Sequence, residues 1–364
     1  MPKEAKFLWK KKLSNQGLGG IAATGEIIIV SDRDLLDSTD IFRGLKADSG
    51  EELWTVRYLA KGNLDYGNSP RATPLIAGDL AYLYGAFGHL HCVELKTGKI
   101  VWKKEIRKEF GTDGPMTWGM ASSPLIAQGK LILNPGGPAA ALVALDPKSG
   151  EVLWKTPGQP AAFGSFLFTK LGGKEQLVGY DQISLGGWDV ATGKRLWTLT
   201  PENDHDFNVA TPVVWRETLI LSTENNSTRL HRFDQSGSIQ SKPIATYEPM
   251  APDMHTPVVV GNRLFGVATK LHCLNLEDNL KPLWTNADEA FSEYATIIAS
   301  DNKLLITAQN GQLLLVDATA DTFKLLSRLT VFPDESGVYA HPALVGKRLF
   351  LRSSMHVVCL KLNP

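Results

Sequence analysis

The chain has little cysteine, no excess of either charge and no long apolar run. Only 3 of its 364 residues are cysteine, which is too few for a disulfide framework. Lysine plus arginine and aspartate plus glutamate both number 38, so no charge excess favours nucleic acid or an anionic membrane surface. No apolar run approaches the length of a membrane span. We therefore expect neither a nucleic acid partner nor a membrane-spanning segment.

Helical periodicity and flexible linkers are also missing. No stretch repeats apolar residues at the i, i+3, i+4, i+7 spacing of an amphipathic helix. Low-complexity tracts that would separate domains do not occur. Hydrophobic residues make up 43% of the chain, which is ample for a packed core. These absences favour a folded protein built from strands.

What the sequence does contain is a repeated phrase of Ser or Thr, Gly, three residues and Trp. In each of four copies the glycine stands four positions before the tryptophan, at Trp54, Trp102, Trp154 and Trp197. Counted from Trp9, the successive intervals are 45, 48, 52 and 43 residues, and Trp284 follows after a further 87, or two repeats. A fixed phrase at this period indicates an array of identical supersecondary units.

Each copy is preceded by two short apolar runs separated by a polar turn, as in residues 72–84 and 256–267. Such runs, bounded by Gly, Asp and Asn, predict antiparallel strands joined by hairpins. Four short strands at this period form one blade of a β-propeller. The sequence thus predicts an all-β, eight-bladed propeller that makes up a single domain over residues 1–364. Seven blades are complete, at 19–57, 69–105, 121–157, 164–200, 209–246, 253–287 and 294–330.

The eighth blade, at about residues 339–362, contains only inner strands. Its missing outermost strand is predicted at the other end of the chain, where Phe7–Lys10 resembles the tryptophan strand of the motif with nothing before it. An N-terminal strand that completes the last blade removes two open sheet edges. We therefore expect the two ends of the chain to meet in one sheet.

The three cysteines, Cys92, Cys273 and Cys359, occupy the same strand position in blades two, six and eight. Equivalent positions on different blades of a ring are too far apart for a disulfide. We expect each cysteine to be a small buried residue. Leu-His-Cys occurs twice and is similar to a metal-binding phrase, but successive side chains of a strand point to opposite faces, so no metal ligand is assigned.

The motif and the blade pattern together resemble the pyrroloquinoline-quinone-like (PQQ-like) repeat of β-propellers, over essentially the whole chain. In that family the glycine permits a tight turn between the two outer strands, and the tryptophan packs between neighbouring blades. The resemblance implies these roles for the glycines and tryptophans of the motif, at Gly50, Gly98, Gly150, Gly193, Trp54, Trp102, Trp154 and Trp197.

Two classes of protein share this repeat: quinoprotein dehydrogenases, which hold the quinone and a calcium ion, and binding scaffolds of the BamB type, which hold no cofactor. The chain has no adjacent cysteine pair, no Cys-x-x-Cys-His phrase and no identifiable set of calcium ligands, and its repeats are near minimal. We therefore expect a non-catalytic binding scaffold without cofactor. A PQQ-dependent alcohol dehydrogenase, with PQQ and calcium, is the alternative.

The first six residues lack the apolar core of a signal peptide. Members of the family are mostly exported, so the resemblance implies the periplasm or cell envelope, with the cytoplasm as the alternative. We expect a monomer.

The loops that lead into the innermost strands are rich in functional side chains and are predicted to gather at one mouth of the central channel. Aromatic rings, hydrogen-bond donors and imidazoles there would suit a protein partner or a small polar ligand. Trp118 is the strongest candidate, because it lies outside the repeated motif in the longest connection between blades. Capping of loop backbone is the alternative role for such polar residues. The candidate ligand-binding residues are Arg71, Trp118, His205, Asn208, His255, Tyr294 and His341; no catalytic residue is assigned.

Overall fold

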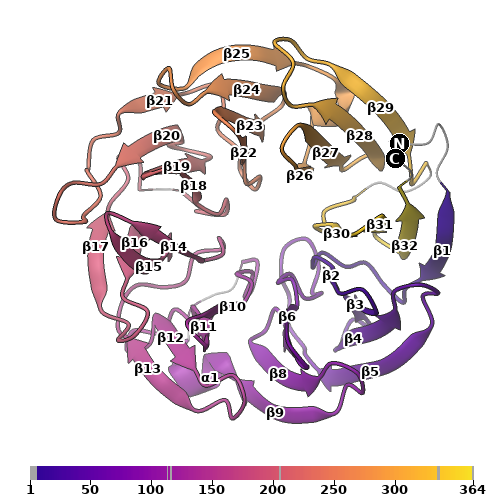
Figure 1. The fold of residues 1–364 in the computed structure, drawn as a ribbon. Coiled ribbons are helices and arrows are strands. Elements are labelled where there is room, and N and C mark those ends of the chain that lie inside the picture. The colour runs from indigo at the N-terminus through magenta and orange to yellow at the C-terminus, as the bar shows by residue number, and fades with distance from the viewer. Residues whose placement is uncertain (1–5, 113, 115–116, 205, 334–336, 363–364) are drawn as a thin grey trace. The chain divides into compact units, whose positions relative to one another are not determined.

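The described residues form eight four-stranded antiparallel sheets, and the fold is an eight-bladed β-propeller, as the repeat predicted (Figure 1). The computed structural model describes residues 6–112, 114, 117–204, 206–333 and 337–362. Two compact units make up the chain, Met1–Pro160 with Phe332–Pro364, and Ala161–Val331. Each unit holds four sheets, and the expectation of a single domain over 1–364 stays a prediction.

Unit 1 contains the first three blades and the last. The first blade is β2 (Ala22–Ala23), β3 (Ile27–Arg33), β4 (Thr39–Lys46) and β5 (Glu52–Leu59). The second is β6 (Leu75–Ala77), β7 (Leu80–Tyr84), β8 (His89–Glu94) and β9 (Ile100–Glu105), and the third is β10 (Leu125–Ala127), β11 (Lys130–Leu133), β12 (Leu142–Leu145) and β13 (Val152–Thr156). The last is β30 (Ala343–Val345), β31 (Arg348–Arg352), β32 (His356–Lys361) and β1 (Phe7–Lys12).

Unit 2 contains blades four to seven. The fourth is β14 (Leu167–Leu171), β15 (Lys174–Tyr180), β16 (Leu185–Trp188) and β17 (Arg195–Leu199), and the fifth is β18 (Val213–Trp215), β19 (Thr218–Thr223), β20 (Ser227–Arg232) and β21 (Ala245–Tyr247). The sixth is β22 (Val258–Val260), β23 (Arg263–Val267), β24 (Leu271–Asn275) and β25 (Lys281–Asn286), and the seventh is β26 (Ala295–Ala299), β27 (Lys303–Ala308), β28 (Gln312–Asp317) and β29 (Leu325–Thr330).

Two short helical segments depart from the expectation of strands alone. They are α1 (Ile106–Phe110) and the 3₁₀ turn η1 (Glu289–Phe291). Neither is long enough to display the repeated apolar spacing by which a helix is recognised in a sequence. Ile106 and Phe110 of α1 are buried, so this single turn covers the edge of the second blade's core.

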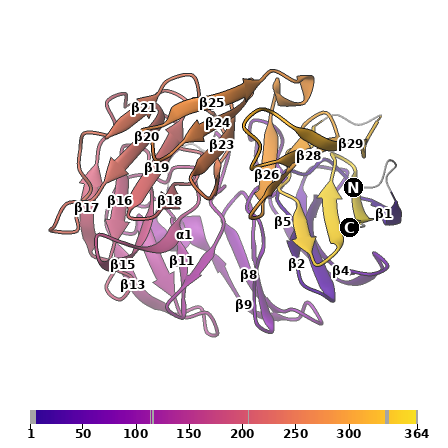
Figure 2. The ribbon, with the colours of Figure 1, turned by 45° about the horizontal axis from the view of Figure 1, so that its top comes forward.

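The first strand of the chain completes the last blade, which confirms the predicted closure. β1 pairs antiparallel with β32, with Trp9 opposite Cys359 (Figures 1 and 2). The Trp9 indole is buried, its Nε1 donates to the carbonyl of Ala47 in the first blade at 3.1 Å, and its ring lies 6.1 Å from that of Phe350. β1 therefore pairs with the last blade through its backbone, and it contacts the first blade through the side chain of Trp9.

The repeated glycine and tryptophan meet between successive blades of unit 1. Gly50 and Gly98 have φ of 71° and 69°, in the left-handed region that glycine enters without strain. An added Cβ would lie 2.7 Å from the ring of Trp9 at Gly50 and 2.7 Å from the ring of Trp54 at Gly98. Trp54 also donates to the carbonyl of Leu95 at 2.8 Å. Each tryptophan thus packs on the glycine turn of the following blade, so the motif requires both residues.

The cysteines are buried and unpaired, as the blade positions predicted. Cys92 lies on β8, Cys273 on β24 and Cys359 on β32, and each is fully inaccessible to solvent. Burial raises the pKa of the Cys273 thiol to about 12 and those of the other two to about 11. The thiols therefore stay protonated at neutral pH and act as small packing groups.

Deletion of residues 1–12 should open the last blade. The deletion removes β1 from β32 and the Trp9 ring from its site between blades, and loss of a buried tryptophan side chain alone costs about 3–5 kcal/mol. The bare edge of β32 should also promote association. Size-exclusion chromatography and thermal unfolding measure both effects. A truncated protein that stays monomeric and melts within about 2 °C of the full chain would contradict the role of β1.

Candidate functional site

The predicted site residues divide between the two units. Arg71, Trp118 and His341 belong to unit 1, whereas Asn208, His255 and Tyr294 belong to unit 2. His205 lies outside the described residues. The structure brings Arg71 to Trp118 in unit 1 and His255 to Tyr294 in unit 2, and a common channel mouth for both groups stays a prediction.

In unit 1, Arg71 connects the loop before the second blade to the loop before the third. Its Nε donates to the carbonyl of Trp118, and its Nη2 donates to the carbonyls of Asp65 and Gly67, the latter at 2.9 Å. The backbone N–H of Asp65 donates to the carbonyl of Thr117 at 3.0 Å and ties the loops a second time. Burial lowers the pKa of Arg71 to about 10, so the guanidinium remains charged at neutral pH. The guanidinium N–H groups of Arg71 therefore bind backbone carbonyls of both loops.

Aromatic rings stand on these connected loops. Trp118 is half-buried, and Tyr66, at φ 62°, exposes 58% of its surface. The Tyr66 ring meets that of Tyr339 edge to face, with centroids 6.5 Å apart and planes at 67°. Sequence reasoning did not select Tyr66 or Tyr339. The glycine after Tyr66 was the available signal, because a glycine between two apolar runs marks a turn.

His341 lies beside the first blade of the same unit. Its carbonyl accepts from the N–H of Ile21 at 3.1 Å, and an added Cβ at Gly20 would lie 3.2 Å from the Cβ of His341. Desolvation by the surrounding protein lowers the pKa of the His341 imidazole below its ordinary value. A neutral imidazole at pH 7 offers one donor and one acceptor to a ligand.

In unit 2, His255 and Tyr294 form a pair. Their ring centroids are 5.7 Å apart, and the backbone N–H of Ala295 donates to Nε2 of His255. Because Nε2 accepts, the proton of the neutral imidazole is assigned to Nδ1. Asn208 is buried, has φ of 54° and donates from Nδ2 to the carbonyl of Asp181 at 3.2 Å. Asn208 thus holds a turn of the loop, which is a structural role.

A quinone with calcium, the alternative named above, requires several oxygen ligands at one point. Within the described part of the chain, no group of three or more His, Cys, Asp or Glu is arranged to hold a metal ion. Separately, no helix of the described residues is long and apolar enough to cross a membrane.

Residues 37–286 match the family model described as outer membrane protein assembly factor BamB. The chain belongs to this family of PQQ-like repeat propellers. The match runs from the turn between β3 and β4 of the first blade to β25 of the sixth, and it includes the four copies of the glycine and tryptophan motif.

Among solved structures, BamB from Moraxella catarrhalis is similar to this BamB-family chain, with a TM-score of 0.70 and 16% identity over 98% of this chain and 100% of that one. Quinohemoprotein alcohol dehydrogenase ADHIIG from Pseudomonas putida gives a TM-score of 0.68 and 11% identity, over 98% of this chain and 76% of that one. At these identities the likeness shows the fold.

One curated sequence relative is quinohemoprotein alcohol dehydrogenase ADH IIB from Pseudomonas putida, which is 28% identical over 127 residues. This stretch is 32% of the present chain and 17% of the relative, so the chain matches about a sixth of that enzyme's length.

Alanine substitutions of Trp54 and Trp118 should distinguish a tryptophan that packs between blades from one that belongs to the candidate site. Trp54→Ala removes a buried ring and its bond to Leu95 and should lower the free energy of unfolding by about 3–5 kcal/mol. Trp118→Ala keeps the carbonyl that Arg71 binds and, because this ring is only half-buried, should lower the free energy of unfolding by clearly less than Trp54→Ala does. Urea unfolding followed by circular dichroism measures both. Equal losses would show that Trp118 is a packing residue.

His91, on the second blade, should make the free energy of unfolding decrease at acid pH. His91 is buried, and its ring stacks on that of Tyr58 at 4.4 Å. Burial lowers the pKa of His91 to about 4, so the unfolded chain takes up this proton at higher pH than the folded one does. The stability associated with neutral His91 is therefore lost as pH falls from about 6.5 through about 4, by up to about 3 kcal/mol.

His91→Phe should remove this part of the acid sensitivity, because phenylalanine keeps a stacked ring and binds no proton. Free energies of unfolding of the two proteins from pH 8 to pH 4 give the difference directly. Parallel curves for the two proteins would show that His91 is not protonated during acid unfolding.

Proposed function

We propose that the chain is a non-catalytic binding scaffold, which recognises a protein partner or a small polar ligand through the loops that lead into its innermost strands. The observation that carries the proposal is the position of Arg71. Its guanidinium connects the loops of blades two and three through three carbonyls and leaves the rings of Tyr66 and Trp118 on a fixed support. Aromatic groups on a rigid support are characteristic of recognition surfaces.

The extent of the structural matches supports the same proposal. BamB from Moraxella catarrhalis is covered over its whole length, whereas the dehydrogenase ADHIIG is covered over 76% of its length. The propeller of this chain matches the whole of that BamB chain, which supports a scaffold role by analogy. By analogy with that family we propose the periplasm or cell envelope as its location, and a monomeric state.

Quinone-dependent alcohol oxidation is the second candidate, and the local sequence identity to ADH IIB is the observation in its favour. On this proposal the loops of the propeller would hold PQQ with calcium. The described residues that meet on the loops of unit 1 are an arginine bonded to carbonyls and aromatic rings. They favour stacking and shape recognition over ion binding.

Reconstitution with cofactor separates the two candidates. The purified chain is incubated with PQQ and calcium chloride, and reduction of a dye by ethanol and other short alcohols is followed, with an apo-quinoprotein alcohol dehydrogenase as the positive control. We expect no bound quinone absorption after gel filtration and no dye reduction above the rate of free PQQ. Saturable, calcium-dependent alcohol oxidation would establish the enzyme and reject the scaffold.

A further inference from the structure

Two adjacent leucines stand almost fully in solvent on the first blade. Leu35 and Leu36 expose 81% and 85% of their surface, the largest fractions among the exposed large hydrophobic residues that the structure describes. They occupy the turn between β3 and β4, here named the leucine turn, residues 34–39. Exposed leucines add nothing to the core, since apolar side chains stabilise a fold only when they leave water. A pair of them on one turn is therefore a candidate for contact with another molecule.

The leucine turn is closed by its own polar groups. Oδ1 of Asp34 accepts from the N–H groups of Ser38 at 2.7 Å and Thr39 at 2.8 Å. The N–H of Asp37 donates to the carbonyl of Asp34 at 3.1 Å, and Asp37 has φ of 51°. The backbone that carries the two leucines is thus held in one conformation.

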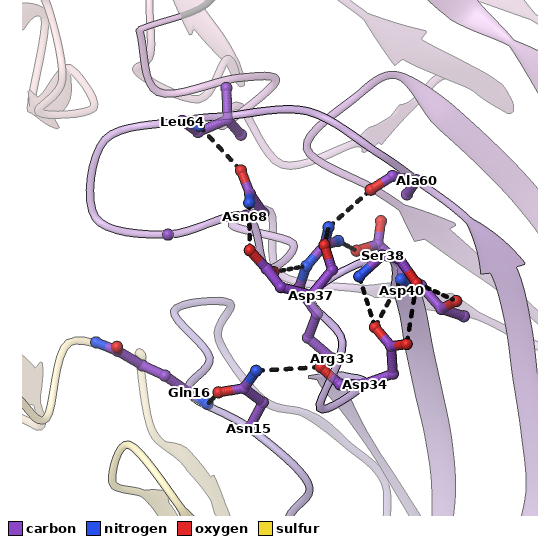
Figure 3. A network of polar contacts seen from close by, with 12 residues as sticks. Asn15, Gln16, Arg33, Asp34, Asp37, Ser38, Asp40, Ala60, Leu64 and Asn68 are labelled. Carbon is purple, nitrogen blue, oxygen red and sulfur yellow. Dashed lines mark hydrogen bonds and ion pairs between the residues drawn. The ribbon is translucent and has the colours of Figure 1, made fainter.

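A buried arginine binds the leucine turn through hydrogen bonds. Arg33 is 1% exposed, and its Nη1 donates to Oδ1 of Asp40 at 2.6 Å. Its Nη2 donates to the carbonyls of Asp37 at 2.8 Å and Ala60 at 2.7 Å, while its Nε donates to the Asp37 carboxylate (Figure 3). A buried guanidinium is costly unless its donors are satisfied, so this arrangement strongly favours one position of the turn.

Two asparagines fix the turn to its surroundings. Nδ2 of Asn68 donates to Oδ2 of Asp37 at 2.5 Å, and Oδ1 of Asn68 accepts from the N–H of Leu64 at 2.9 Å. On the other side, Nδ2 of Asn15 donates to the carbonyl of Asp34 at 3.1 Å (Figure 3). Asn68 belongs to the same loop as Tyr66, so the leucine turn and the aromatic loop of the candidate site are connected directly.

The charge around the leucines is negative. Residues 34–39 include two aspartates and no lysine or arginine. Arg33 and Asp40 are both buried and paired with each other, so Asp34 and Asp37 are the carboxylates of this network that lie beside the leucines at the surface. A molecule that covers the leucines therefore meets an acidic rim.

We propose that the leucine turn binds an apolar segment of a partner protein that is flanked by lysine or arginine. The inference rests on the proposed scaffold function and goes beyond it by naming a surface and the chemistry of its partner. A rigid turn loses little backbone freedom on binding, so ordering of the turn offsets less of the free energy gained by burial of the two leucines. The acidic rim selects basic partners through complementary charge.

Other occupants fit this surface less well. An anionic membrane would be repelled by the aspartates beside the leucines, because Arg33, which pairs with Asp37, is buried and offers no positive charge at the surface. A second copy of the chain, placed turn against turn, would bring two acidic rims together, which costs free energy. Both remain distinguishable outcomes of the experiment.

Selection from a displayed library of random peptides tests the proposal. The full chain, the double variant L35S/L36S and the control V152S/L153S are immobilised in parallel; Val152 and Leu153 are an exposed pair on the outer strand β13, at 42% and 49%. We expect the full chain and the control to enrich peptides with apolar residues flanked by lysine or arginine. The double variant should lose that enrichment by about tenfold or more, since each buried leucine contributes to binding.

Thermal unfolding checks that the double variant is folded, and the single variant L36Q replaces it if it is not. Enrichment that is unchanged in the leucine variants, or peptides without basic residues, would overturn the proposal. So would leucine-dependent sedimentation with phosphatidylglycerol vesicles, or leucine-dependent self-association in sedimentation velocity. The reconstitution with PQQ is independent of this result, so failure of the scaffold function and failure of the docking turn can be told apart.

Discussion

The contact between a tryptophan and the glycine turn of the next blade is the constraint on which the rest of unit 1 depends. A four-stranded blade presents two apolar faces that it cannot bury alone, so each blade needs its neighbours. The indole of Trp54 fills the space beside Gly98 and bonds to the Leu95 carbonyl, and Trp9 does the same at Gly50 and Ala47. The motif therefore recurs once per blade because each blade makes this contact with the next.

Closure of the last blade follows from the same contact. β1 supplies the outermost strand of a sheet whose other strands lie at the far end of the chain, and its tryptophan occupies the position that the motif occupies elsewhere. The first and last blades are thereby joined through side chains that are more than 300 residues apart, as in the bond from Arg352 Nη1 to the Ser31 carbonyl. Long-range pairing of this kind makes the stability of the last blade dependent on the first strand.

Two arginines hold loops between the strands in fixed positions. Arg71 and Arg33 both donate to backbone carbonyls and thereby hold connections that have no regular secondary structure of their own. One consequence is an aromatic loop around Tyr66, and the other is a turn that presents two leucines to solvent. Loops that are fixed by buried hydrogen bonds on a rigid propeller suit recognition, which agrees with the proposed scaffold role.

The repeat by itself determined the eight blades, the missing outer strand and its place at Phe7–Lys10, which the structure extends to Lys12, because a fixed phrase marks equivalent positions and a truncated copy marks an incomplete sheet. It also indicated that the cysteines are separate buried residues. It could not reveal the helix α1, which is a single turn without a pattern. Which loop residues serve backbone and which face solvent was decided by the tertiary structure alone. The sequence predicts Arg71 and Asn208 as candidate ligand residues, and in the fold both donate hydrogen bonds to backbone carbonyls. It does not predict Tyr66, Leu35 or Leu36, whose side chains are exposed. Loop geometry depends on hydrogen bonds between segments far apart along the chain, and a one-dimensional pattern carries no record of those partners.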